Sequence, residues 1–482
     1  MTNRRRVLLR GAVAAVGALV AVAVALRPLP GAAQPAAHDG DGAYRGFFAA
    51  RLVDGTLEVI EERNATARFV PASVLKIATA AAALEHLGAD YRWVTRLTSE
   101  APVDGTTLAG DLVIVPGADP TWGRDGAPDA LAALARQVRE RGLTRVAGDL
   151  VVDAGRFPGR RHPLDRGIGD LAYRHGTPAA ALAVDEATIT VRAAPGAALG
   201  LPARIEAPAG VELINRTTTV GRDRHGAGTL DFLPLWGSDT LLVRGEYPIS
   251  EPTFVVPASD PSPARRAADR LRGALAQAGV RVEGTVRAGD APTPASGSAT
   301  ALAEHRSPPL ESLLPDILTD SHNWYADMLA LTLGLEAAGT GRFDDGVGVV
   351  SDFVNGLAES AAAPGRDEVW LVDGSGLSPA NLVTPSAIVR LLAHAVSRPW
   401  GAVLIDALAT PGEGTLRSWP RLPPAAAKTG TLRHTVALAG FLHPRSATPL
   451  PFCYFVNHRP GRPAPARREI AASLRAWSPG AP

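Results

Sequence analysis

The sequence predicts an α/β (α+β) fold in which an antiparallel sheet is flanked by helices and interrupted by a large, mostly β insertion. Three observations lead to this expectation. Two alternating strand patterns precede an alanine-rich helix in the first hundred residues, and the middle of the chain consists of short apolar runs broken by Gly, Pro and Asp. Helical patterns and three further strand patterns then follow, and these would complete the layer that the first strands begin.

The composition is that of an ordinary globular chain, and its length of 482 residues predicts about three domains. The 46% hydrophobic and 20% charged residues exclude wholesale disorder. A net charge of +1, with arginines scattered without aromatic interleaving, argues against a nucleic-acid partner. Cys453 is the single cysteine, in an apolar run that predicts a buried structural thiol. No H-E-x-x-H, paired C-x-x-C or His cluster occurs, so we expect neither a metal nor a cofactor.

The first 33 residues have the pattern of an export signal. A basic start is followed by the apolar run Gly11–Leu26 and by small residues that precede the expected cleavage point. The Arg5-Arg6 pair also permits a twin-arginine route, and Arg27 leaves an uncleaved membrane anchor as the alternative. We therefore expect an exported protein of the periplasm, cell wall or extracellular space, with membrane association only through this segment.

Residues 34–98 are predicted to form the first part of the main domain. Two alternating stretches, Gly46–Val53 and Thr56–Glu62, surround an Asp-Gly pair, which predicts a β-hairpin. The stretch Phe69–Gly88 predicts a helix, because a proline stands near its start, an alanine-rich run follows and a glycine ends it. Strands ahead of this helix indicate a layer of sheet and helix.

Residues 99–300 are predicted to form one or more inserted β-rich domains. Short apolar runs bounded by turn formers predict strands at Asp111–Val115, Asp149–Val152 and Thr188–Val191. Helical patterns occur at Asp129–Arg141 and Pro263–Ala278, and the Pro/Gly/Ser-rich stretch Ala288–Ala299 predicts a linker.

Residues 301–482 are predicted to complete the main domain. A helical pattern covers Leu310–Leu335, and the stretch Asp373–Pro385 is dense in turn formers. Strands are then predicted at Ala427–Leu432, Val436–His443 and Phe452–Asn457, followed by an amphipathic helix at Ala464–Trp477.

A hydroxyl and an amine are brought together by the predicted N-terminal helix. Ser73 and Lys76 are three residues apart, so they share a helix face and can act as nucleophile and base. Of the 49 Lys and Arg residues, only Lys76 and Lys428 are lysines. Arginine stays protonated, whereas a buried lysine can lose its proton. The two lysines therefore indicate chemistry that arginine cannot perform, and the alternative, two accidental lysines in an arginine-rich chain, does not explain their positions.

Three motifs occur in chain order: S-V-L-K at Ser73–Lys76, S-H-N at Ser321–Asn323 and K-T-G at Lys428–Gly430. Together they resemble the active-site set of penicillin-binding proteins and serine β-lactamases. The long gap between the first two resembles the D-alanyl-D-alanine carboxypeptidase/endopeptidase family of class C low-molecular-mass penicillin-binding proteins, whose transpeptidase-like domain is split by insertions. The segments G-D-L-V-I-V-P-G-A-D-P-T from Gly110 and D-G-S-G-L-S from Asp373 are also similar to that family.

The resemblance implies a serine DD-peptidase that cleaves the terminal D-Ala-D-Ala bond of peptidoglycan stem peptides, D-configured cross-links, or both. It implies an acyl-enzyme on Ser73, with β-lactam antibiotics as covalent inhibitors. Lys76 would accept the proton of Ser73 if burial and the nearby Lys428 lower its pKa. Ser321 would relay that proton to the leaving amine, and Asn323 would hold Lys76 and the substrate amide.

The resemblance also assigns substrate-binding residues. Lys428 would supply a fixed positive charge for the substrate carboxylate, beside Thr429 and Gly430. The backbone N–H groups of Ser73 and Thr431 would form the oxyanion hole. Asp153, in V-V-D-A-G-R-F, resembles a residue of the insertion that contacts the diamino acid of the substrate in some members, and a solvated turn residue is its alternative. The insertion as a whole is expected to position the peptide without being needed to build the catalytic layer.

Three positions depart from the family pattern. His322 stands where Asp is common, Asp327 where Glu is common, and Pro379 where Arg is frequent. The first two lie outside the motif residues and predict tuning of the site, whereas Pro379 leaves the peptide preference open.

Two alternative functions share these motifs. A serine β-lactamase would hydrolyse its acyl-enzyme quickly, but the long gap and the lack of a recognisable class A deacylating Glu motif argue against it. A cell-wall-binding protein without turnover is the other alternative, and the presence of both lysines within complete motifs argues against that function. The balance of carboxypeptidase and endopeptidase activity and the oligomeric state stay open from sequence.

Overall fold

A computed structural model describes residues 41–124, 129–221, 229–235, 237–289, 299–358 and 367–478. The predicted export segment at 1–33 and most of the predicted linker lie outside these described residues. Within the described ranges, no helix combines the length and apolar character needed to cross a membrane.

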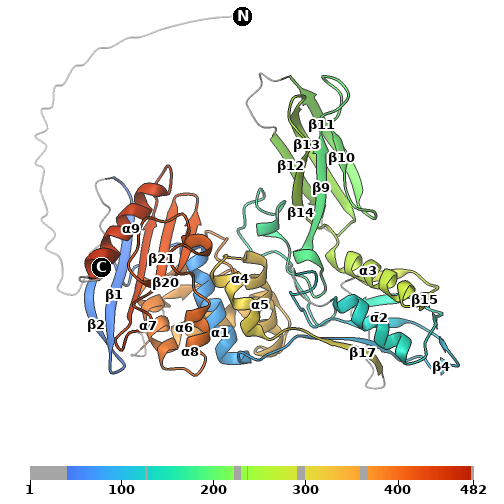
Figure 1. The fold of residues 1–482 in the computed structure, drawn as a ribbon, viewed down its shortest axis with the longest axis horizontal. Coiled ribbons are helices and arrows are strands. Elements are labelled where there is room, and N and C mark those ends of the chain that lie inside the picture. The colour runs from blue at the N-terminus through green and yellow to red at the C-terminus, as the bar shows by residue number, and fades with distance from the viewer. Residues whose placement is uncertain are drawn as a thin grey trace, which may run out of the picture. The chain divides into compact units, whose positions relative to one another are not determined.

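A five-stranded antiparallel sheet in the order β2-β1-β22-β21-β20 joins segments from both ends of the described chain (Figure 1). Its strands are β1 (Tyr44–Val53), β2 (Thr56–Arg63), β20 (Ala425–Leu432), β21 (Thr435–Leu442) and β22 (Leu450–Asn457). The β1–β2 hairpin turns at Asp54 and Gly55, whose φ angles of 49° and 79° are those that a tight two-residue hairpin requires. Both β21 and β22 are buried along their whole length, because helices pack on both faces of the sheet.

A helical layer covers one face of this sheet, and its core includes Phe441 and Phe455. The layer contains α1 (Lys76–Leu87), α4 (Leu314–Leu318), α5 (Asn323–Glu336), α6 (Phe343–Asn355), α7 (Pro385–Val396) and α8 (Gly401–Asp406). The other face packs against α9 (Ala464–Trp477), where Trp477 contacts the rings of Phe47 and Phe452. Side chains of neighbouring residues in each strand point to opposite faces of the sheet and therefore pack in different cores, because the side chains of a strand alternate with a period of two residues.

The region between β3 and β17 builds four further sheets with the strand orders β16-β8-β6-β3-β17, β15-β7-β5-β4, β10-β9-β14 and β11-β13-β12. The strands of the first two are β3 (Val94–Ser99), β4 (Val103–Asp104), β5 (Thr107–Leu108), β6 (Leu112–Val115), β7 (Arg145–Val146), β8 (Leu150–Asp153), β15 (Arg281–Val282), β16 (Val286–Gly289) and β17 (Thr300–Arg306). Those of the other two are β9 (Thr188–Ala194), β10 (Arg204–Glu206), β11 (Glu212–Val220), β12 (Thr229–Leu235), β13 (Thr240–Pro248) and β14 (Phe254–Ser259). A short pair, β18 (Val369–Trp370) and β19 (Leu382–Val383), lies later in the chain.

Two helices, α2 (Ala130–Glu140) and α3 (Pro263–Gln277), share a hydrophobic core with the first of these sheets. Asp129 caps α2 by accepting hydrogen bonds from the N–H groups of Leu131 and Ala132, which satisfies donors that a helix start leaves free. Since β3 and β17 pair antiparallel, the chain enters and leaves this region on neighbouring strands. The boundaries at 98/99 and 300/301 fall within or beside these strands, and the division into segments stays a prediction.

Candidate active site

Ser73 and Lys76 lie at the start of the buried helix α1. Ser73 belongs to a short 3-10 turn, η1 (Ala72–Leu75), and Lys76 is the first residue of α1. The spacing brings Lys76 Nζ to 2.9 Å from Ser73 Oγ. Lys76 is fully buried, whereas Ser73 keeps partial exposure. The hydroxyl can therefore meet a substrate from one side and the amine from the other.

Two glycines allow neighbouring segments to pack directly against this turn. A Cβ on Gly430 of β20 would lie 2.7 Å from the Pro71 carbonyl oxygen. A Cβ on Gly376 would lie 1.9 Å from the Ala72 carbonyl oxygen, and Gly376 has a φ of 77°. The K-T-G strand and the D-G-S-G-L-S loop thus touch the backbone beside the hydroxyl because both carry glycine there.

The Lys76 amine has three polar neighbours. Besides Ser73 Oγ, its Nζ lies 2.7 Å from Asn323 Oδ1 and 2.6 Å from the Ser375 carbonyl oxygen. A neutral amine has two N–H bonds and one lone pair. It can therefore donate to Asn323 and Ser375 while its lone pair accepts the proton of the serine hydroxyl, which is the arrangement that a general base needs.

The environment of Lys76 favours this neutral form. Burial is the largest cause that lowers the pKa of Lys76, which falls to about 7. The negative charges of Asp327 and Asp373 raise the pKa, and the positive charge of Arg166 lowers it. Burial thus lowers the pKa as the sequence predicted, and Arg166 is a further positive charge that lowers it, which the sequence did not reveal. Lys428 and Lys76 also repel each other when both are charged, since the charge of Lys76 lowers the pKa of Lys428.

Lys428 is also fully buried, on β20, where its Nζ donates to the Thr429 carbonyl oxygen at 3.1 Å. Burial, followed by the charge of Lys76, lowers the pKa of Lys428 well below its ordinary value, and Asp320 raises it. The role of Lys428 as a positive charge for the substrate carboxylate stays a prediction.

The S-H-N motif lies at the start of α5. Ser321 has a φ of 68°, a strained value for a residue other than glycine and one that is frequent at functional sites. In the described part of the chain its hydroxyl makes no hydrogen bond, and the proton relay through Ser321 stays a prediction. His322 is the N-cap of α5, and Asn323 is its first residue. Asn323 Oδ1 faces Lys76, and its Nδ2 donates to the His175 carbonyl oxygen at 3.0 Å.

The His322 side chain contacts Glu186, a residue of the insertion. Its Nε2 lies 2.9 Å from Glu186 Oε2, and its ring stacks on Tyr325 with a centroid separation of 3.9 Å. Tyr325 OH donates to Glu186 Oε1 at 3.0 Å. Burial raises the pKa of Glu186, but hydrogen bonds from His322 and Arg174 lower it to about 2. A charged carboxylate of the insertion thus fixes the S-H-N turn, with His322 in the place of the common Asp.

A buried arginine is the principal site residue that the sequence did not reveal. Arg166 Nη2 donates to carboxylate oxygens of Asp327 and Asp373, and to Ser375 Oγ at 2.9 Å. Its side chain is 1% exposed. Arg166 belongs to no motif, so no signal in the sequence separates it from the other arginines.

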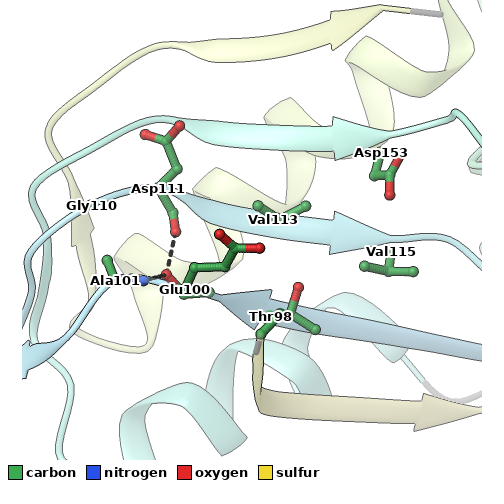
Figure 2. Close-up of a pocket in the computed structure, with 10 residues that line it drawn as sticks. Thr98, Glu100, Ala101, Gly110, Asp111, Val113, Val115 and Asp153 are labelled. Carbon is green, nitrogen blue, oxygen red and sulfur yellow. Dashed lines mark hydrogen bonds between the residues drawn. The ribbon is translucent and has the colours of Figure 1, made fainter. Parts of the chain in front are cut away.

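The predicted substrate-binding residues fall in two places. Thr429, Gly430 and Thr431 follow Lys428 on β20, with Thr429 buried and Thr431 exposed. Asp153 ends β8 and lines a cavity of about 620 Å³ in the insertion (Figure 2). The residues that line this cavity, among them Glu100 and Asp111, include none of the predicted catalytic residues. The contact of Asp153 with a diamino acid therefore stays a prediction.

The described ranges offer little support for a catalytic thiol or for a metal site. Cys453 is buried in β22, and burial raises the pKa of its thiol well above the ordinary value. In these same ranges no three His, Cys, Asp or Glu side chains come together as metal ligands.

A family model described as the D-Ala-D-Ala carboxypeptidase 3 (S13) family matches residues 34–478. The D-alanyl-D-alanine carboxypeptidase of Actinomadura sp. (strain R39) is 33% identical over 454 residues, which cover 90% of this chain and 81% of that protein. The D-alanyl-D-alanine carboxypeptidase DacB of Haemophilus influenzae is 25% identical over 437 residues, covering 86% of each.

The fold is shared with a solved structure. Penicillin-binding protein 4 (dacB) of Haemophilus influenzae superposes with a TM-score of 0.78 at 23% identity, covering 90% of this chain and 96% of that one. A crystal structure of the same protein in complex with a β-lactam gives a TM-score of 0.74 at 22% identity, covering 90% and 96%. The predicted fold class, a helix-flanked antiparallel sheet interrupted by a β-rich insertion, is confirmed.

We predict that Gly376→Ala lowers the free energy of unfolding by about 2 kcal/mol or more, because a non-glycine residue is strained at positive φ and its Cβ would meet a carbonyl oxygen. Urea unfolding followed by circular dichroism measures the change. Gly273→Ala is the control, because this exposed α3 position has no atom within 4 Å of a new Cβ. It should gain up to about 1 kcal/mol. Equal stability of the two variants would contradict the close packing of the loop on the Ser73 turn.

Proposed function

The chain belongs to the D-Ala-D-Ala carboxypeptidase 3 (S13) family, and on that premise we propose how its residues act as a serine DD-peptidase on peptidoglycan stem peptides. The observation that carries the assignment is the buried contact of 2.9 Å between Lys76 Nζ and Ser73 Oγ. A lysine with a pKa of about 7 is half neutral at neutral pH, so it can accept the serine proton. Ser73 is then the nucleophile and Lys76 the general base.

Acylation would begin with attack of Ser73 Oγ on the carbonyl carbon of the penultimate D-Ala. The serine proton passes to Lys76, and the backbone N–H groups of Ser73 and Thr431 stabilise the negative oxygen that forms. The C–N bond then breaks, and the terminal D-Ala leaves as an amine after receiving a proton from Lys76, either directly or through Ser321. Water hydrolyses the acyl-enzyme, with Lys76 accepting a proton from it, and regenerates the Ser73 hydroxyl.

Lys428 would bind the terminal carboxylate of the substrate. Its amine is buried, and burial lowers its pKa well below the ordinary value. An arriving carboxylate favours the ammonium and raises the pKa of Lys428. A substrate with a free carboxylate would therefore favour the charged form of this amine, and the adjacent Thr429 hydroxyl would donate to the same group. This arrangement favours substrates with a free carboxyl terminus.

The same chemistry would make β-lactams covalent inhibitors, since their reactive amide resembles the acylated bond and they also carry a carboxylate. The Haemophilus influenzae relative has been crystallised with a β-lactam. We also propose export through the segment at 1–33, because peptidoglycan lies outside the cytoplasmic membrane. Cleavage of D-configured cross-links would use the same serine, and monomeric and cross-linked muropeptides resolved by mass would measure the balance of the two activities.

Ser73→Ala should abolish covalent labelling by a fluorescent penicillin, because the variant lacks the oxygen that forms the ester. Gel fluorescence measures the label, and mass spectrometry of the parent locates it on the peptide that contains Ser73. Circular dichroism serves as the control for folding.

The lifetime of the label separates the alternative functions. Stable labelling supports the peptidase, rapid loss of label would indicate a β-lactamase, and no labelling of the parent would indicate a protein without turnover. Labelling of the Ser73→Ala protein at another serine would overturn the assignment of the nucleophile.

Replacing each of the two lysines by arginine should affect the rate of acylation differently. Lys76→Arg keeps the charge but removes the base, so acylation should fall roughly 10²–10⁴-fold. Lys428→Arg keeps a cation for the carboxylate and should be milder than Lys428→Ala. Stopped-flow acylation rates with one penicillin, measured across pH, test both expectations. A Lys76→Arg protein that acylates nearly as fast as the parent would show that Lys76 is not the base.

A further inference from the structure

Among the described residues of the segment 99–300, Arg166 is the one whose charge acts on Lys76. It lies outside the three motifs and is separated from Asp327 by 161 residues of sequence. Both the arginine side chain and the two carboxylates that it binds are at most 1% exposed. Its Nη2 reaches Asp327 on α5, Asp373 in the D-G-S-G-L-S loop and the Ser375 hydroxyl.

We propose that Arg166 is a positioning residue through which the insertion controls the catalytic base: by neutralising Asp327 and Asp373 and holding the Ser375 segment, it keeps Lys76 in its neutral, proton-accepting form. This inference rests on the proposed role of Lys76 as the base.

The contacts connect Arg166 to the base by two routes. The first is geometric, because Ser375 accepts from Arg166 through its hydroxyl and from Lys76 through its carbonyl oxygen. The second is electrostatic. Two carboxylates, Asp327 and Asp373, act on Lys76 and favour its charged form, and Arg166 offsets them. Loss of the guanidinium would leave both anions uncompensated in a buried site, where charges act strongly.

The other charged and titratable groups of the neighbourhood do not replace Arg166. Lys428 on β20 is buried, and its own pKa is lowered, while Asp320 acts on Lys428. His162 lies near Arg166, and burial followed by the arginine charge lowers the pKa of this imidazole to about 4, so it is neutral at pH 7. Burial raises the pKa of Asp327, while the charges of Arg166 and Lys76 lower it and that of Asp373 raises it. Besides the base itself, Arg166 is therefore the cation that acts on this carboxyl group.

Stability alone does not account for this arginine. Within the described residues, its Nε and Nη1 are buried and have no protein hydrogen-bond partner. A buried ion pair is often no more stable than well-packed apolar side chains, because both charges lose their hydration. A role in setting the charge of the neighbouring base gives the costly burial a function. On this proposal the insertion contributes to the state of the base, in addition to its expected role in positioning the peptide.

The test measures the rate of acylation by one penicillin as a function of pH. Acylation needs neutral Lys76, so the rate rises as pH passes through the pKa of Lys76. In Arg166→Met the uncompensated carboxylates raise that pKa, and the rising limb should move to higher pH by about one unit. The rate at pH 6 then falls roughly tenfold and recovers above pH 9. Arg166→Lys, which keeps the charge, should leave the limb closer to its parental position.

A second variant should shift the pH dependence of acylation in the opposite direction. Asp327→Asn removes one anion that favours charged Lys76, so the limb should move to lower pH while Arg166 stays paired with Asp373. The double variant Arg166→Met/Asp327→Asn should bring the limb back towards that of the parent. A purely structural role would slow acylation at every pH without these opposite shifts.

Arg160→Met is the matched control, because Arg160 lies in the same loop and pairs with Asp344 at the surface. It should leave the limb in place. If Arg166→Met does not fold, Asp327→Asn decides the question by its own shift. If the acylation rate of the parent rises with pH as expected but the Arg166 and Asp327 variants show the same pH dependence, this inference alone is overturned. If the acylation rate of the parent does not rise with pH, the role of Lys76 as the base is overturned as well.

Discussion

The burial of the Lys76 amine is the constraint on which the rest of the site depends. An amine in water would be protonated at neutral pH and could not take a proton from serine. Removing it from water lowers its pKa to about 7, but a buried amine also needs polar partners. Asn323 Oδ1, the Ser375 carbonyl and Ser73 Oγ provide them, each from a different segment of the chain. The helix, the S-H-N turn and the D-G-S-G-L-S loop therefore have to meet at one point.

The fold achieves this meeting by joining distant parts of the chain. The central sheet pairs β1 with β22, and β20 passes the turn that carries Ser73. The insertion contributes from a third direction, because Arg166, the His175 carbonyl and Glu186 all contact the segment 321–327 or its neighbours. The insertion thus contacts the segments that carry the proposed catalytic groups.

The sequence predicted those parts of the fold and of the site that depend on local residue patterns. The Asp-Gly hairpin, the helix after Pro71 and the strands around Lys428 follow from turn chemistry and periodicity, and the rarity of lysine pointed to Lys76 and Lys428. The contact between Arg166 and Asp327 follows no local pattern, because it depends on how the insertion folds back. The lowered pKa of Lys428 depends on its complete burial, which the sequence does not reveal. The cavity beside Asp153 likewise arises only when β3, β6 and β8 assemble.

Direct titration of the lysine side chains tests the central claim. Because the chain has only two lysines, protein labelled with ¹³C at lysine Cε gives two such signals in NMR, and Lys76→Met identifies one of them. The account predicts that the Lys76 signal titrates with a midpoint near 7 in the ligand-free protein. A Lys76 signal that stays in the protonated position up to pH 9 would contradict the account, because an amine that remains charged cannot take the proton of Ser73.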